Sequence, residues 1–409
     1  MEPVPIRLGI AVLLALVLAG AGMASFHFVN RHRLEASPAL LGIPGIEDSE
    51  PSMDAQKAQI RQLLAQDDYA AIESLLQKSI DNYKQGRISD IALRNLFFVF
   101  EDTDPGLEKR YDAWWGQYPR SYSVHLARGI YFRSLAQERR GDKFIQETPV
   151  ENIDEMEDML GRAFRELQSS LNLDDKPVLT YQYLISSAKH VKKREYLRRQ
   201  LDASLQIDPK NFVVRRVYLR ALRPRWGGSI GQMQAFVQEC RAAGLPPAQI
   251  SELEALVEEE LAWVAEQDQQ FPLAIQHYAN AVRAFPHSND DLWLDYARVT
   301  KEHADCATAL PVFTHLTERG DQLKTYRAWV HSNRAWCLGR LNHQQEAYEE
   351  IRIAAELGDP WAQTELGEVL YHGGVVPANR AEAAEWFRKA ADQGDETARK
   401  RVAGIHDHP

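Results

Sequence analysis

The chain has 409 residues, a formal net charge of −10 and 44% hydrophobic residues. The acidic balance argues against a nucleic-acid-binding protein, because phosphate contacts need an excess of Lys and Arg. Three Cys are too few for a disulfide framework, and the apolar fraction excludes a largely disordered chain. We therefore expect a folded body without a nucleic-acid partner.

The N-terminus differs from the rest of the chain. Leu8–Ala24 contains no charged residue, and its length falls between a signal-peptide core and a spanning helix. We interpret residues 1–33 as a hydrophobic helix that is a transmembrane anchor or signal segment, and residues 34–53 as a linker. This predicts a single-pass protein of the bacterial inner membrane with a periplasmic body, or a secreted or periplasmic protein after cleavage. The alternative is a soluble cytosolic structural repeat protein whose first helix is part of the core.

The following residues show helical spacing. Between Met156 and Leu171, apolar residues recur three and four positions apart, and no alternating strand pattern is found after Met53. Thr148-Pro-Val-Glu151 predicts a capping box with Pro at the first helical position. The sequence thus predicts an all-α fold of short antiparallel helix pairs, irregular over residues 54–250.

A repeat is visible over residues 251–409. A small residue, a large one four positions on and a small one three further recur at nearly constant spacing, which is the tetratricopeptide pattern. Small residues let two helices approach, and the large residue fills the space between them. The repeat positions are Ala274, Tyr278 and Ala281; Ala309 and Phe313; Ala347, Ile351 and Ala354; and Ala383, Phe387 and Ala390.

The last of these units is more specific. Ala362-Gln-Thr-Glu-Leu-Gly367, Gly373-Gly-Val-Val-Pro377 and Ala383-Ala-Glu-Trp-Phe-Arg-Lys-Ala-Ala391 resemble a Sel1-like repeat, a tetratricopeptide relative with a longer loop between its helices. The resemblance covers residues 361–396 and departs where Val375 replaces the usual Gly. It implies a helical-hairpin repeat solenoid.

Residues 54–250 resemble a bacterial domain of unknown function, family 4034. The resemblance is carried by Trp115, Tyr118-Pro-Arg-Ser121, Ala127-Arg-Gly129, Ala136-Gln-Glu-Arg-Arg-Gly141 and Arg223-Pro-Arg-Trp-Gly-Gly-Ser229. It implies no function, because none is assigned to that family.

One motif suggests catalysis. Gly227-Gly-Ser229-Ile-Gly231 matches the G-x-S-x-G elbow of serine hydrolases, which needs a strand before the Ser and a helix after it. The residues before Ser229 are predicted to form a helix and not a strand. The pattern therefore favours Ser229 as a helix cap, and a hydrolase using Ser229 is kept as an alternative.

Opposite charges are segregated along the chain. Residues 189–225 hold twelve Lys and Arg against three acids, whereas residues 252–268 hold seven acids and no base. Either the two segments neutralise each other, or the basic one binds an anionic partner. The candidate residues for such binding are Lys192, Lys193, Arg198, Arg199, Arg223 and Arg225.

Few other residues in the sequence indicate a metal, catalytic or redox site. No metal-binding spacing of His or Cys is found, and no catalytic residue or cofactor is predicted. Cys306 and Cys337 fall in neighbouring repeats and could approach each other, but two buried thiols are favoured. We expect a non-catalytic, membrane-anchored scaffold or adaptor that holds a protein or peptide partner in its solenoid groove. The oligomeric state stays open.

Overall fold

The computed structural model describes residues 53–141, 148–188, 194–286 and 290–407. The apolar N-terminal segment, the linker up to residue 52, and Lys192 and Lys193 lie outside these residues. Within them every regular element is a helix, which confirms the all-α prediction. Among the same residues, no helix combines the length and apolar character that crossing a membrane requires.

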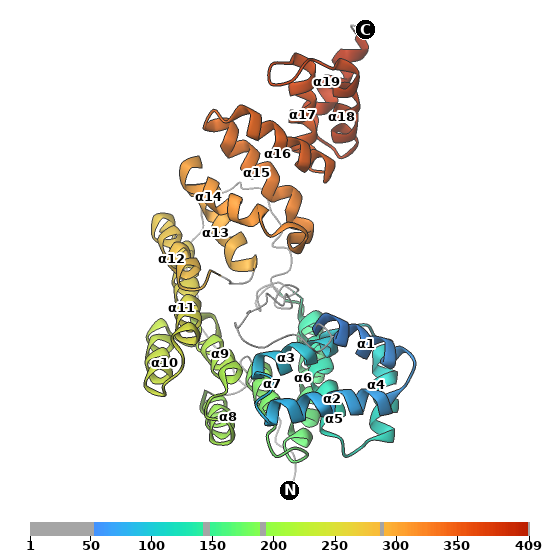
Figure 1. The fold of residues 1–409 in the computed structure, drawn as a ribbon, viewed down its shortest axis with the longest axis vertical. Coiled ribbons are helices and arrows are strands. Elements are labelled where there is room, and N and C mark those ends of the chain that lie inside the picture. Colours follow the sequence, from blue (N-terminus) through green and yellow to red (C-terminus); the bar gives the residue numbers. More distant parts are fainter. Residues whose placement is uncertain (1–52, 142–147, 189–193, 287–289, 408–409) are drawn as a thin grey trace.

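The helices fall into two parts (Figure 1). The first part, α1 to α10, forms a rounded bundle followed by a short arm, and the second, α11 to α19, forms a stack of helix pairs. The helices of the first part are α1 (Met53–Ala65), α2 (Tyr69–Lys84), α3 (Asp90–Phe97), α4 (Leu107–Gln117), α5 (Tyr122–Arg140), α6 (Val150–Ser170), α7 (Val178–Ala188), α8 (Arg194–Ile207), α9 (Phe212–Ala221) and α10 (Ile230–Ala242), with the 3-10 helices η1 (Phe98–Glu101) and η3 (Pro224–Trp226).

The second part begins with α11, which packs against α9 and α10 of the first part. The stack contains α11 (Pro247–Gln267), α12 (Phe271–Ala284), α13 (Asp290–His303), α14 (Cys306–Thr317), α15 (Arg327–Arg340), α16 (Gln344–Glu356), α17 (Pro360–His372), α18 (Arg380–Asp392) and α19 (Glu396–Asp407), with η4 (Gly320–Tyr326) before α15. Its hairpins are α11–α12, α13–α14, α15–α16 and α17–α18, and each packs on the next. The last helix, α19, covers α18 at the end of the stack.

The repeat positions form the interior of this stack. All eleven predicted residues are buried, from Ala274 and Tyr278 to Phe387 and Ala390. The close approach is clearest at Gly367, where an added Cβ would lie 2.6 Å from the Phe387 ring. Burying such a large apolar side chain contributes about 1.5–3 kcal/mol. The repeat prediction is therefore confirmed at the level of packing.

In the first part, similar packing is found around α5. Every residue of α5 from Tyr122 to Ala136 is buried, because other helices surround it. An added Cβ on Gly129 would lie 2.7 Å from Leu167 of α6. The pair α5–α6 is thus a repeat-like hairpin in the region that the sequence shows as irregular.

Two helix termini show how the sequence sets the ends of the elements. Gly358 takes a positive φ of 98°, and its N–H donates to the Ala355 carbonyl at 3.1 Å, which ends α16. The capping box at Thr148 is wrong. Pro149 has an extended ψ of 145° and is itself the cap, so α6 begins one residue later and no side chain caps it.

Candidate functional site

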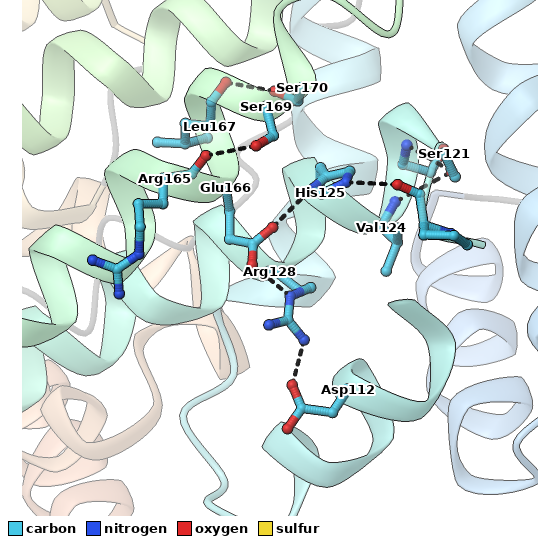
Figure 2. Close-up of polar contacts among 12 residues, drawn as sticks. Asp112, Ser121, Val124, His125, Arg128, Arg165, Glu166, Leu167, Ser169 and Ser170 are labelled. Atoms are coloured by element: carbon cyan, nitrogen blue, oxygen red, sulfur yellow. Dashed lines mark hydrogen bonds and ion pairs between the residues drawn. The ribbon is translucent and has the colours of Figure 1, made fainter. Parts of the chain in front are cut away.

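A buried ionic cluster joins α5 to α6 (Figure 2). His125 and Arg128 project from α5 toward Glu166 of α6, and Arg128 also pairs with Asp112 of α4. His125 Nδ1 lies 2.6 Å from Glu166 Oε2, and Arg128 Nε donates to Glu166 Oε1 at 2.9 Å. Burial alone would raise the pKa of Glu166, but the bonds from His125 and Arg128 outweigh it and hold the pKa below its ordinary value of 4.5.

The same cluster occurs in the repeat stack. His331 Nδ1 lies 2.6 Å from Glu350 Oε2, and Arg334 pairs with the other carboxylate oxygen of Glu350. In both hairpins the His stands four residues before the small residue of the first helix, Gly129 or Ala335. The Glu stands directly before the large residue of the second helix, Leu167 or Ile351. In α11–α12 the two types are exchanged, with Glu258 on the first helix and His277 on the second, 2.7 Å apart.

These clusters hold helices together and show no sign of a reaction centre. The second ring nitrogen of His125, Nε2, lies 3.1 Å from the Pro119 carbonyl, so both ring nitrogens contact oxygens of the protein itself. The nearby Ser121 hydroxyl donates to Glu73 and accepts from the first backbone N–H groups of α5, as a helix cap does. The His-x-x-Arg spacing on the first helix is visible in the sequence, and it is the signal that indicates these clusters.

Ser229 lies where the cap interpretation places it. It is the N-cap of α10, and its Oγ accepts from the Gln232 N–H at 3.2 Å. The residues before it belong to α9 and to the 3-10 turn η3, so no strand precedes the Ser. The nucleophile elbow requires that strand, and the Ser229 site therefore lacks the geometry of a serine hydrolase.

The basic and acidic segments meet. Arg223 Nη2 donates to Glu259 at 2.9 Å and its Nε lies 3.3 Å from Glu260, while Arg225 also pairs with Glu260. Glu260 is fully buried, and both arginines reach its carboxylate. Arg223 and Arg225 are thus engaged in internal pairs, as one of our two interpretations expects.

The other predicted basic residues are placed differently. Arg198 of α8 forms a bidentate ion pair with Glu239 of α10, in which Nη1 and Nη2 each donate to a carboxylate oxygen at 2.8 Å. Arg198 also pairs with Asp202. Arg199, next to it, is exposed. Binding of an anionic partner at this face stays a prediction.

The repeat register also defines a row of residues beside the buried small residues of the first helices. The small residue of each first helix is buried: Ala262, Ala297, Ala335 and Gly367. The next residue on each helix forms what we call the first-helix row: Trp263, Arg298, Trp336 and Glu368. Trp336 is the most open of the four, at 43% exposed, and Arg340 lies over its ring at 5.7 Å. Trp and Arg are the residues that most often dominate binding energy at protein interfaces.

The two repeat cysteines are both free thiols in one apolar cluster. Burial, and then Cys306, raise the pKa of the Cys337 thiol well above its ordinary value, so it stays protonated at neutral pH. Among the described residues, no group of His, Cys, Asp or Glu has the arrangement of a metal site.

A cavity of about 500 Å³ opens between α5 and α6 beside the start of α4. Its floor includes Tyr131 and Met159, and its rim carries exposed carboxylates such as Asp154 and Asp158. These carboxylates are solvated, and nothing in the cavity points to a particular ligand.

Comparison with known proteins gives one match to a family model, over a short segment. Residues 362–395 match the model of the Sel1 repeat. This agrees with the sequence resemblance, whereas the resemblance of residues 54–250 to family 4034 stays a prediction. No curated protein matches the chain.

Several solved structures are similar in fold, at low identity. The protective antigen c5321 of uropathogenic Escherichia coli is 18% identical, with 86% of this chain and 72% of that chain covered and a TM-score of 0.35. A Sel1 repeat protein from Oxalobacter formigenes is 16% identical, covering 51% and 84%, with a TM-score of 0.30. Yeast Tom70 is 11% identical, covering 86% and 88%, with a TM-score of 0.27.

Proposed function

We propose that the protein is a non-catalytic scaffold that binds a protein partner along the first-helix row and is held at the bacterial inner membrane by residues 1–33. The observation that carries the proposal is the stack of hairpins from α11 to α18 with a Sel1 repeat at its end. Such stacks present an extended surface, and their repeats typically serve protein interaction.

Trp336 is the centre of the proposed interface. A large aromatic side chain at 43% exposure gains apolar burial when a partner covers it, and it adds little conformational entropy cost. Its neighbours in the row bear charges that are already paired, Arg298 with Glu266 and Glu368 with Arg401. The apolar contact with Trp336 would therefore supply the affinity, and the flanking charges would orient the partner.

A photo-crosslinking experiment tests the interface. A photoreactive phenylalanine analogue would replace Trp336 in the full chain expressed in its host, with Leu273 of α12 replaced as the matched control. Leu273 is similarly exposed, at 39%, but lies on a second helix. We expect a discrete protein adduct from position 336 and none from position 273. Equal labelling at both positions, or no adduct at 336, would contradict the proposal.

The membrane part of the proposal rests on the sequence of residues 8–24 alone. We expect the full chain to sediment with membranes and to resist carbonate extraction, and a chain lacking residues 1–33 to be found in the soluble fraction. Soluble behaviour of the full chain would reject the anchor while leaving the scaffold proposal intact.

A further inference from the structure

Two of the three cysteines of the chain lie at one packed junction of the stack, between its second and third hairpins. Cys306 is the first residue of α14 and Cys337 lies in the last turn of α15, and these two helices pack against each other (Figure 1). Both side chains belong to the apolar cluster around Phe313. The third cysteine, Cys240, is buried in a different cluster. Cys306 and Cys337 are therefore the two thiols that the fold brings together.

The register of the two helices places these thiols at matching heights. Helix α14 ends at Thr317 and α15 begins at Arg327, and because the two helices pack together across this short connection, the chain reverses direction between them. At 1.5 Å per residue, Cys306 lies about 16 Å before the end of α14, and Cys337 lies about 15 Å after the start of α15. Side chains at matching heights on two packed antiparallel helices can reach each other.

The surroundings of the two thiols agree with this placement. Cys337 is fully buried, whereas Cys306 is partly exposed. Burial is the largest cause that raises the pKa of Cys337, and the next is the Cys306 side chain, through hydrogen bonding and through charge. A reagent in solution can therefore reach Cys306 directly, while Cys337 is reached only through Cys306 or through an opening of the helix pair.

We propose that Cys306 and Cys337 form a redox-sensitive disulfide that ties the second hairpin of the stack to the third. Both residues are free thiols in the structure, which is the reduced state of the pair. The stability of a repeat stack depends on the contacts between neighbouring units, so a covalent link between two hairpins strengthens one of these contacts. The proposal depends neither on the interface at Trp336 nor on the membrane anchor.

The reaction is a thiol–disulfide exchange, with a small disulfide such as oxidised glutathione as the oxidant. The thiolate of Cys306 attacks one sulfur of the oxidant, whose S–S bond breaks as the first thiolate leaves. Cys337 then loses its proton and attacks the Cys306 sulfur, which forms the bond between the two cysteines and expels the second thiolate. The two leaving thiolates take up the two protons that the cysteines lose. The protein thereby loses two electrons, and the oxidant gains them.

The test is oxidation of the full chain with oxidised glutathione, followed by alkylation of the remaining thiols and peptide mapping by mass spectrometry. The variant is Cys306→Ser, which removes one thiol of the pair at a partly exposed position. The matched control is Cys240→Ala, which removes the thiol that lies in the other cluster. Thermal unfolding of each protein is recorded after oxidation, with and without an added reductant.

We expect a peptide pair joined through Cys306 and Cys337 in the wild type and in Cys240→Ala, and none in Cys306→Ser. Closing a loop of about 30 residues restricts the unfolded chain, so the oxidised wild type should melt about 4 °C or more above the reduced protein. The reductant should abolish this difference. Alkylation of all three cysteines after oxidation, a disulfide that involves Cys240 or joins two chains, or an unchanged melting temperature would overturn the proposal. Peptide mapping of the wild type decides the question even if Cys306→Ser does not fold.

Discussion

The hairpins α5–α6 and α15–α16 join their two helices through the same kind of ionic cluster, but they lie in different surroundings. Both place a His and an Arg three residues apart on the first helix and a Glu on the second, directly before the large core residue. They differ in their surroundings. Residues 141–149 separate α5 from α6, whereas residues 341–343 separate α15 from α16.

The difference explains why one hairpin is visible as a repeat and the other is not. In the stack, neighbouring hairpins impose a regular spacing, and the period can be read directly. Around α5, the helices α2, α4 and α7 and the 3-10 helix η1 cover faces that a repeat neighbour would cover. The residues that pack the two helices of the pair together are therefore present, whereas the regular spacing between successive pairs is absent.

The largest expected effect comes from removing the glutamate of each cluster. Glu350→Ala leaves His331 and Arg334 buried without their shared carboxylate and should cost about 3 kcal/mol of unfolding free energy or more. Glu166→Ala should cost a similar amount if the hairpins are equivalent. Urea unfolding measures both, with the exposed Glu346→Ala as a control that should cost about 0.5 kcal/mol or less. A negligible cost at Glu166 would break the comparison.

The next effect comes from the small residues. Gly129→Ala and Gly367→Ala would force a Cβ into Leu167 and Phe387 and should each destabilise by about 1–3 kcal/mol. Gly161 also lies within α6, but its added Cβ meets no atom closer than 3.8 Å. Gly161→Ala should therefore stabilise by about 0.5–1 kcal/mol. The account fails here if Gly129→Ala raises stability as Gly161→Ala does.

Helix caps give a smaller contrast between the regions. Ser229→Ala removes one bond to the Gln232 N–H and should cost about 1 kcal/mol. Ser121→Ala also removes the bond to Glu73 and should cost more. Thermal unfolding of the two variants measures the difference, and an equal or smaller cost at Ser121 would contradict it.

The smallest expected effect is a loss of folding stability at acidic pH. The pKa of Glu166 is held below 4.5 in the folded state, so its contribution to stability is complete above that pH and is lost as pH falls through the lower folded pKa. The stability advantage of the wild type over Glu166→Gln should therefore shrink between about pH 5 and pH 3. Urea midpoints for both proteins across that range measure it, and a constant difference would exclude the mechanism.

The sequence predicts the packing better than the electrostatics. The small and large repeat positions and the Ser229 cap follow from residue type and spacing, because they depend on neighbours along the chain. The contact between α3 and α9 does not, because these helices are distant in sequence and meet only in the fold. The basic segment was recognised from the sequence, but only the fold shows that Arg216 and Arg223 pair with Glu252 and Glu259.

The central claim is that the repeat stack binds a partner through Trp336. The most direct measurement is the dissociation constant of the crosslinked partner, once identified, for the full chain carrying Trp336→Ala or Leu273→Ala. We expect Trp336→Ala to weaken binding about tenfold or more, as interface aromatic residues do, with unchanged unfolding stability. Leu273→Ala should bind like the wild type. Equal affinities for Trp336→Ala and the wild type, or a loss confined to Leu273→Ala, would contradict the account.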